Sequence, residues 1–115
     1  MPQQGADSQP TISTHVLDTG SGKPAASVHV TLSKLDGDGR AIRMTQALTD
    51  GDGRVRDLLE RPLTPGEYRL EFDVAHEDGS FFTKVAIDLR ITDAERSYHV
   101  PLLLAPYSMT TYRGS

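Results

Sequence analysis

The chain has 115 residues, which is enough for one domain but not for several. It contains no cysteine, so disulfides, thiolate nucleophiles and thiolate metal sites are excluded. The 12 Lys and Arg residues stand against 16 Asp and Glu residues, and the resulting net charge of -4 is mixed along the chain. Because there is no basic stripe, we expect no nucleic-acid partner.

Hydropathy along the chain argues against a membrane span and against a secretory signal. The longest apolar run, residues 100–105, is far shorter than the roughly 20 residues that span a bilayer. Residues 1–10 have neither the basic nor the apolar region of a secretory signal. We therefore predict a disordered tail at residues 1–10, one domain at residues 11–115, no membrane association, and a cytoplasmic location by default.

Alternation of apolar and polar residues, which is typical of half-buried strands, dominates the chain. It is clearest at residues 68–74 and 85–91, where one face is apolar and the other is mostly charged. In chain order, strands are predicted at residues 13–17, 28–33, 43–49, 68–74, 85–91, 98–104 and 107–112. Pro101 indicates that its strand lies at a sheet edge or is unpaired on that side.

Turn-forming residues separate these strands at the spacing that hairpin or Greek-key connections require. They lie at residues 19–22, 36–39, 50–53, 65–66 and 78–79. An all-β sandwich follows. One helical turn is conceivable at residues 92–95, where Thr92 and Glu95 fit a capping box, although a loop is the alternative.

The sequence Asp-Gly-Asp-Gly-Arg occurs twice, at residues 36–40 and 50–54. Asp-rich glycine loops suggest calcium, but an EF-hand loop needs a bidentate acid at its twelfth position. Ala47 and Arg61 stand there instead. Both segments are therefore predicted to be tight turns, and no metal site is expected.

The four histidines show no spacing that places two metal ligands side by side on one element. His29 and His76 are predicted to be solvated. His15 and His99 each lie on the polar face of a predicted strand, where a group of near-neutral pKa suits proton transfer. Their distance in sequence leaves open whether they meet.

The chain closes with Tyr-Arg-Gly-Ser, residues 112–115. One interpretation is a frayed terminus, which is the usual state of last residues. The other is that Tyr112, following directly on an apolar strand, anchors the end and holds Arg113 at the protein surface. The spacing alone leaves both interpretations open.

Three separated motifs resemble the family of transthyretin-related 5-hydroxyisourate hydrolases. They are Ser-Thr-His-Val-Leu-Asp at residues 13–18, His-Val-Pro-Leu-Leu-Leu-Ala-Pro-Tyr at residues 99–107, and the closing Tyr-Arg-Gly-Ser. The similarity runs in register from residue 11 to residue 115, and three motifs in the right order make it specific. It implies a transthyretin-like β-sandwich of seven to eight strands in two sheets, with at most one short helix.

The resemblance also implies an activity and an assembly. The family hydrolyses the N1–C6 amide of 5-hydroxyisourate to 2-oxo-4-hydroxy-4-carboxy-5-ureidoimidazoline in urate breakdown, without a metal or organic cofactor. Its members are homotetramers, dimers of dimers with the active sites between the dimers. Transferred to this sequence, the catalytic residues are His15, Arg54, His99 and Ser115, and the substrate-binding residues are Arg113 and Tyr112.

The residue types agree with that chemistry. Hydrolysis of an amide needs a base for the water, an acid for the departing nitrogen, and positive donors where the oxyanion develops. His15 and His99 supply the base and the acid, in an order that the sequence leaves open. Arg54 and Arg113 can form paired hydrogen bonds to a planar, electron-rich substrate.

Two departures and two alternatives accompany the resemblance. Residues 81–84 and residues 108–111 differ from the usual family pattern, which leaves the shape of the pocket's surroundings open. A transthyretin-like carrier of small aromatic ligands has the same fold, but it lacks the two histidines and the closing tetrapeptide. A β-sandwich interaction module is the other alternative, and it requires an exposed apolar patch.

Overall fold

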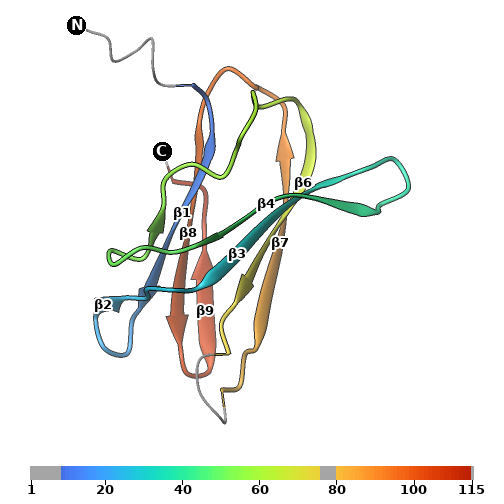
Figure 1. The fold of residues 1–115 in the computed structure, drawn as a ribbon. Coiled ribbons are helices and arrows are strands. Elements are labelled where there is room, and N and C mark those ends of the chain that lie inside the picture. The colour runs from blue at the N-terminus through green and yellow to red at the C-terminus, as the bar shows by residue number, and fades with distance from the viewer. Residues whose placement is uncertain (1–8, 76–79, 115) are drawn as a thin grey trace, which may run out of the picture.

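The structure is a computed structural model that describes residues 9–75 and 80–114, and the chain there forms two packed β-sheets (Figure 1). Sheet A has the order β2-β1-β8-β9, with β5 also paired to β1. Its strands are β1 (Ile12–Asp18), β2 (Lys23–Pro24), β5 (Arg54–Val55), β8 (Tyr98–Ala105) and β9 (Ser108–Thr111). Sheet B has the order β4-β3-β6-β7, formed by β3 (His29–Leu35), β4 (Ala41–Leu48), β6 (Gly66–Asp73) and β7 (Lys84–Ile91).

The predicted β-sandwich is confirmed, and each of the seven predicted strands has a counterpart. The described residues contain two further strands, β2 and β5, which are two residues long and therefore too short to show alternation. Residues 1–8 of the predicted tail, His76 and Ser115 lie outside the described residues.

The predicted helical turn at residues 92–95 is a loop, in which the Glu95 N–H donates to the Asp93 carboxylate at 2.9 Å. Asp93 thus accepts the hydrogen bond that the capping box assigned to Thr92, and it closes a side-chain turn in place of a helix cap. Among the described residues, no helix has the length and hydropathy needed to span a membrane.

The core lies between the sheets, where alternate residues of facing strands meet. On β6, Tyr68, Leu70 and Phe72 are fully buried, and Val16 and Leu102 are fully buried on β1 and β8. Each such side chain stabilises the fold by on the order of 1.5–3 kcal/mol relative to exposure. The two buried tyrosines of the described residues have hydrogen-bonded hydroxyls, since Tyr68 donates to the Thr64 carbonyl and Tyr98 donates to the Asp93 carbonyl, both at 2.7 Å.

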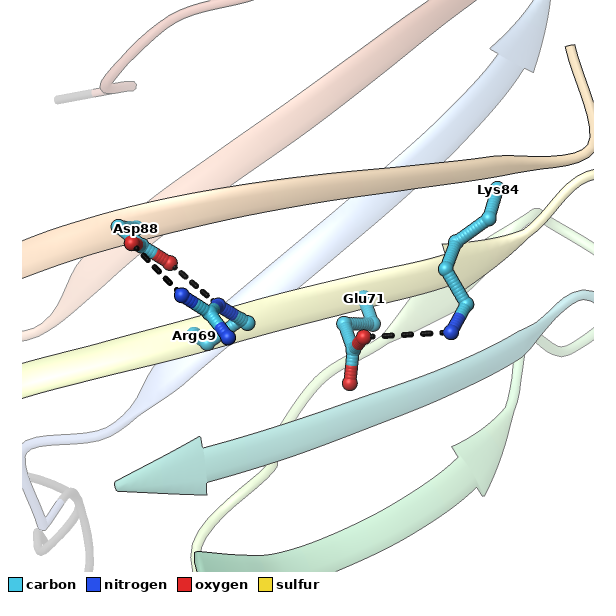
Figure 2. Close-up of polar contacts among 4 residues, drawn as sticks. All are labelled: Arg69, Glu71, Lys84 and Asp88. Atoms are coloured by element: carbon cyan, nitrogen blue, oxygen red, sulfur yellow. Dashed lines mark hydrogen bonds and ion pairs between the residues drawn. The ribbon is translucent and has the colours of Figure 1, made fainter. Parts of the chain in front are cut away.

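The outer face of sheet B carries cross-strand ion pairs (Figure 2). Arg69 on β6 donates to both carboxylate oxygens of Asp88 on β7, at 2.7 and 3.1 Å, and the Arg69 hydrogen bond lowers the pKa of Asp88. Lys84 and Glu71 form a second pair at 3.3 Å. These exposed pairs favour the β6–β7 register but are screened by solvent, so they contribute little to stability.

Pro101 interrupts sheet A without lying at its edge. β8 is flanked by β1 and β9, so the edge prediction is wrong. The ladder with β9 ends at the Leu102–Thr111 pair and resumes in the same register only at the His99–Gly114 bridge. Pro101 has no N–H to donate, and its carbonyl accepts the Thr111 hydroxyl at 2.8 Å instead. Pairing with β9 is therefore interrupted at Pro101 itself, which fits the second alternative locally, although β8 is paired on that side at His99 and from Leu102 onward.

Candidate functional site

Strand alternation places two histidines and an arginine on the outer face of sheet A. In β1, Thr14 points into the core and is 1% exposed, so its neighbours Ser13 and His15 point outward. Residues opposite each other in neighbouring strands share a face. His15 lies opposite Arg54 of β5, and Ser13 lies opposite His99 of β8. The structure therefore brings together three residues that are distant in sequence.

His99 is half-buried and has a defined partner at one ring nitrogen. Its Nδ1 lies 2.9 Å from the Ser13 hydroxyl oxygen. Burial lowers the pKa of His99 below its ordinary 6.5, and the positive charge of Arg54 and then His15 lower it further. A neutral imidazole is therefore favoured near pH 7. If its Nδ1–H donates to Ser13, Nε2 keeps a lone pair that can accept a proton.

The C-terminal segment returns to β8 beside His99. The Gly114 N–H donates to the His99 carbonyl at 2.7 Å. A Cβ at Gly114 would lie 3.0 Å from Cδ2 of the His99 ring, so this close approach favours glycine. The backbone is thus held at Gly114, which supports the anchored alternative over a frayed end up to this residue. Ser115 lies outside the described residues.

Tyr112 and Arg113 lie differently from the histidines. Tyr112 is 55% exposed, so its ring does not anchor the terminus by burial. Both residues line a pocket of about 320 Å³ beside the edge strand β7, and the lining does not include His15, Arg54 or His99. Their contact with a substrate stays a prediction.

Sequence reasoning missed Ser13 as a site residue. The signal was present, because Ser13 stands two residues before His15 and therefore shares its face. What the sequence could not show is the parallel β1–β8 pairing that places Ser13 opposite His99. Within residues 9–75 and 80–114, no cluster of three acidic, histidine or cysteine side chains could hold a metal ion.

Comparisons with known proteins identify the family of the chain. A profile of the HIUase/Transthyretin family matches residues 12–114. The 5-hydroxyisourate hydrolase of Deinococcus radiodurans is 43% identical over 92% of this chain and 97% of its own length. The uric acid degradation bifunctional protein TTL of Arabidopsis thaliana is 42% identical over 94% of this chain. The matched region is 38% of the length of that longer protein.

Two solved structures are similar over most of the chain. That of Klebsiella pneumoniae 5-hydroxyisourate hydrolase has a TM-score of 0.80 at 35% identity and covers 93% of this chain and all of its own. Sea bream transthyretin in complex with thyroxine has a TM-score of 0.82 at 28% identity and covers 90% of this chain and 93% of its own. By profile, by sequence identity and by fold, the chain belongs to the HIUase/Transthyretin family.

Proposed function

We propose that this protein is a 5-hydroxyisourate hydrolase, which opens the six-membered ring of its substrate at the N1–C6 amide. The observation that carries the proposal is the meeting of His15, Arg54 and His99 on one face of sheet A. A carrier of small aromatic ligands does not need two histidines and an arginine there. The 43% identity to the Deinococcus hydrolase supports the same choice.

The geometry suggests a role for each of the three residues. His99, whose lowered pKa favours the neutral form, takes a proton from water as the water oxygen attacks C6. Arg54 donates hydrogen bonds to the oxyanion that develops on the C6 oxygen. His15 donates a proton to N1 as the C6–N1 bond breaks. The products are a carboxyl group formed from C6 and a ureido group whose terminal –NH2 is N1, so the atoms of one water are accounted for.

The closing residues complete the proposed site. We assign Ser115, which follows Gly114 in the chain, to positioning water or substrate with its hydroxyl or carboxylate. Arg113 and Tyr112 are assigned to substrate binding. What supports a role for this segment is the bridge between Gly114 and His99, which ties the end of the chain to the strand that carries the proposed base.

We further propose a homotetramer in which two dimers meet over the outer face of sheet A. Beyond His15, this face continues with the partly exposed apolar residues Leu17, Leu103 and Ala105. The second contact, between the two subunits of each dimer, is proposed at the pocket beside β7 and at the edge strand β9. Unpaired strand edges favour pairing with another chain. The oligomeric state can be measured by light scattering coupled to size-exclusion chromatography.

The activity is tested directly with freshly generated 5-hydroxyisourate. We expect the purified protein to accelerate the loss of its ultraviolet absorbance well beyond the spontaneous rate. The control is the same solution without protein, since the substrate also decays unaided. A rate equal to that of the control at near-neutral pH would refute the hydrolase and leave the carrier, whose binding of small aromatic ligands can be measured by calorimetry.

The hydroxyl of Ser13 should matter for catalysis because it holds Nδ1 of the proposed base. We expect Ser13→Ala to lower kcat/KM about tenfold, since one neutral hydrogen bond contributes about 1–1.5 kcal/mol. Ser13→Thr keeps a hydroxyl and should lose much less. Steady-state kinetics of both variants test this, and equal rates for Ala and Thr would exclude a role for the hydroxyl.

A further inference from the structure

The two Asp-Gly-Asp-Gly-Arg segments fold into the same turn. Through Oδ1, Asp36 accepts the N–H groups of Asp38 and Arg40, both at 2.9 Å. Asp50 does the same for the residues two and four positions later, at 2.8 and 3.0 Å. In each turn the first Asp N–H also donates to the Arg carbonyl, at 3.0 Å in one and 2.9 Å in the other. The hydrogen bonds of the two turns therefore agree to within 0.1 Å.

The surroundings of the two turns differ. The turn at residues 36–40 joins β3 to β4 and projects away from the two sheets, whereas the turn at residues 50–54 lies beside β2 and β1 (Figure 1). A Cβ at Gly39 would meet nothing within 4 Å. At Gly53 it would lie 2.4 Å from the Val16 carbonyl oxygen, and the Gly53 carbonyl accepts the Val16 N–H at 2.7 Å. Only the second turn is packed against the sandwich.

The residue before the second turn is also held firmly. Thr49 is buried, with its hydroxyl donating to the Ala25 carbonyl at 2.7 Å and accepting the Val28 N–H at 2.9 Å. The turn is therefore fixed at its start by Thr49 and along its length by β1. Its last residue is Arg54, which is half-buried opposite His15, whereas Arg40 at the same position of the first turn is exposed.

We infer that Asp50 is a positioning residue for Arg54 in the reaction. Asp50 binds both polar groups of the Arg54 main chain, through its carboxylate to the N–H and through its own N–H to the carbonyl. Asp50 therefore fixes the backbone position from which the Arg54 side chain extends, next to His15 and His99. This inference rests on the proposed function, because it assigns Asp50 to the arginine that stabilises the oxyanion.

Geometry and charge can be separated at this position. The hydrogen bond from the Arg54 N–H lowers the pKa of Asp50, so the group is a carboxylate at neutral pH. Asparagine offers the same Oδ1 acceptor without the charge, as in other side-chain turns. Alanine removes the acceptor altogether. If position is what matters, Asp50→Asn should behave like the native protein and Asp50→Ala should not.

His99 provides a reporter that requires no substrate. Burial lowers the pKa of His99 most, and the charged groups that lower it further are Arg54 on β5 and His15 on β1. If the Arg54 guanidinium moves away, the pKa of His99 should rise toward 6.5. The titration of the His99 ring protons by NMR measures this directly.

The experiment compares Asp50→Ala, Asp50→Asn and the matched control Asp36→Ala in the full chain. For Asp50→Ala we expect kcat to fall at least tenfold with a smaller change in KM, because Arg54 acts on the transition state, and the pKa of His99 to rise. Asp50→Asn should recover most of the rate. Asp36→Ala should leave both the rate and the titration unchanged, although it removes the same local hydrogen bonds.

The outcomes separate the inference from the proposed function. Native rates and a native His99 titration in Asp50→Ala would overturn the inference, as would an equal loss in Asp36→Ala. If the native protein does not hydrolyse 5-hydroxyisourate but Asp50→Ala still shifts the His99 titration, the proposed function fails and the positioning contact stands. Should Asp50→Ala not fold, Asp50→Glu keeps the charge but moves the acceptor outward by one methylene, and a native rate with a native His99 titration in that variant would overturn the inference.

Discussion

Replacing His99 with asparagine is expected to lower kcat/KM for 5-hydroxyisourate by about 100- to 10,000-fold, the range that a general base contributes. Asparagine is polar, is smaller than the imidazole that lies against Gly114, and can still bond to the Ser13 hydroxyl, so the fold should be retained. What it cannot do is accept a proton near neutral pH. Steady-state kinetics on the folded variant measure the loss.

His29→Asn is the matched control, because His29 is an exposed strand residue on sheet B. It should keep the native rate. A His99→Asn variant within twofold of the native rate would remove His99 from the mechanism.

The pH dependence follows from the lowered pKa of His99. Since the neutral ring is the active form, the acidic fall of kcat/KM should lie below pH 6.5 and should vanish from any residual rate of His99→Asn.

The free energy of unfolding should also depend on pH through His99. Its folded-state pKa lies below the unfolded value, so the stability it contributes is fully present above pH 6.5 and is lost as the pH falls through the folded-state pKa. Chemical denaturation at several pH values measures this.

The longer strands could be predicted because alternation is a local signal. Seven predicted segments correspond to β1, β3, β4, β6, β7, β8 and β9. The two-residue strands β2 and β5 contain no period, so nothing local marks them. This limit matters for the site, because β5 is the strand that places Arg54 opposite His15. Only the family resemblance, and not the strand pattern, pointed to Arg54.

The meeting of the histidines depends on long-range pairing. Alternation correctly put His15 and His99 on the polar faces of their strands, but a face becomes a site only when the strands are neighbours. The parallel β1–β8 ladder makes them so, and it also brings in Ser13, which the sequence did not single out. Pro101 shows the same limit, because its missing N–H predicted a break in pairing but not which neighbour would be lost.

The largest expected loss of stability is at Gly53. Its φ of 76° lies in the left-handed region, which costs a side-chain-bearing residue about 1–2 kcal/mol. A Cβ there would also lie 2.4 Å from the Val16 carbonyl oxygen and 3.0 Å from Cβ of Pro24. Because the nearest atom belongs to the main chain, the backbone of the turn or of β1 must move to make room. Overpacking of this kind adds about 1–3 kcal/mol. We expect Gly53→Ala to lose about 2–5 kcal/mol of unfolding free energy, measured by urea denaturation.

Gly39→Ala isolates the backbone contribution, because Gly39 has a φ of 81° at the matching position of the first turn and no atom within 4 Å of the added Cβ. It should lose only about 1–2 kcal/mol. Equal losses in the two variants would mean that the close approach of Gly53 to β1 carries no energy. A larger loss at Gly53, together with a fall in kcat/KM that Gly39→Ala does not share, would show that this contact both stabilises the sandwich and sets the place of Arg54. The stability of the fold and the proposed chemistry would then both depend on the close contact between Gly53 and β1.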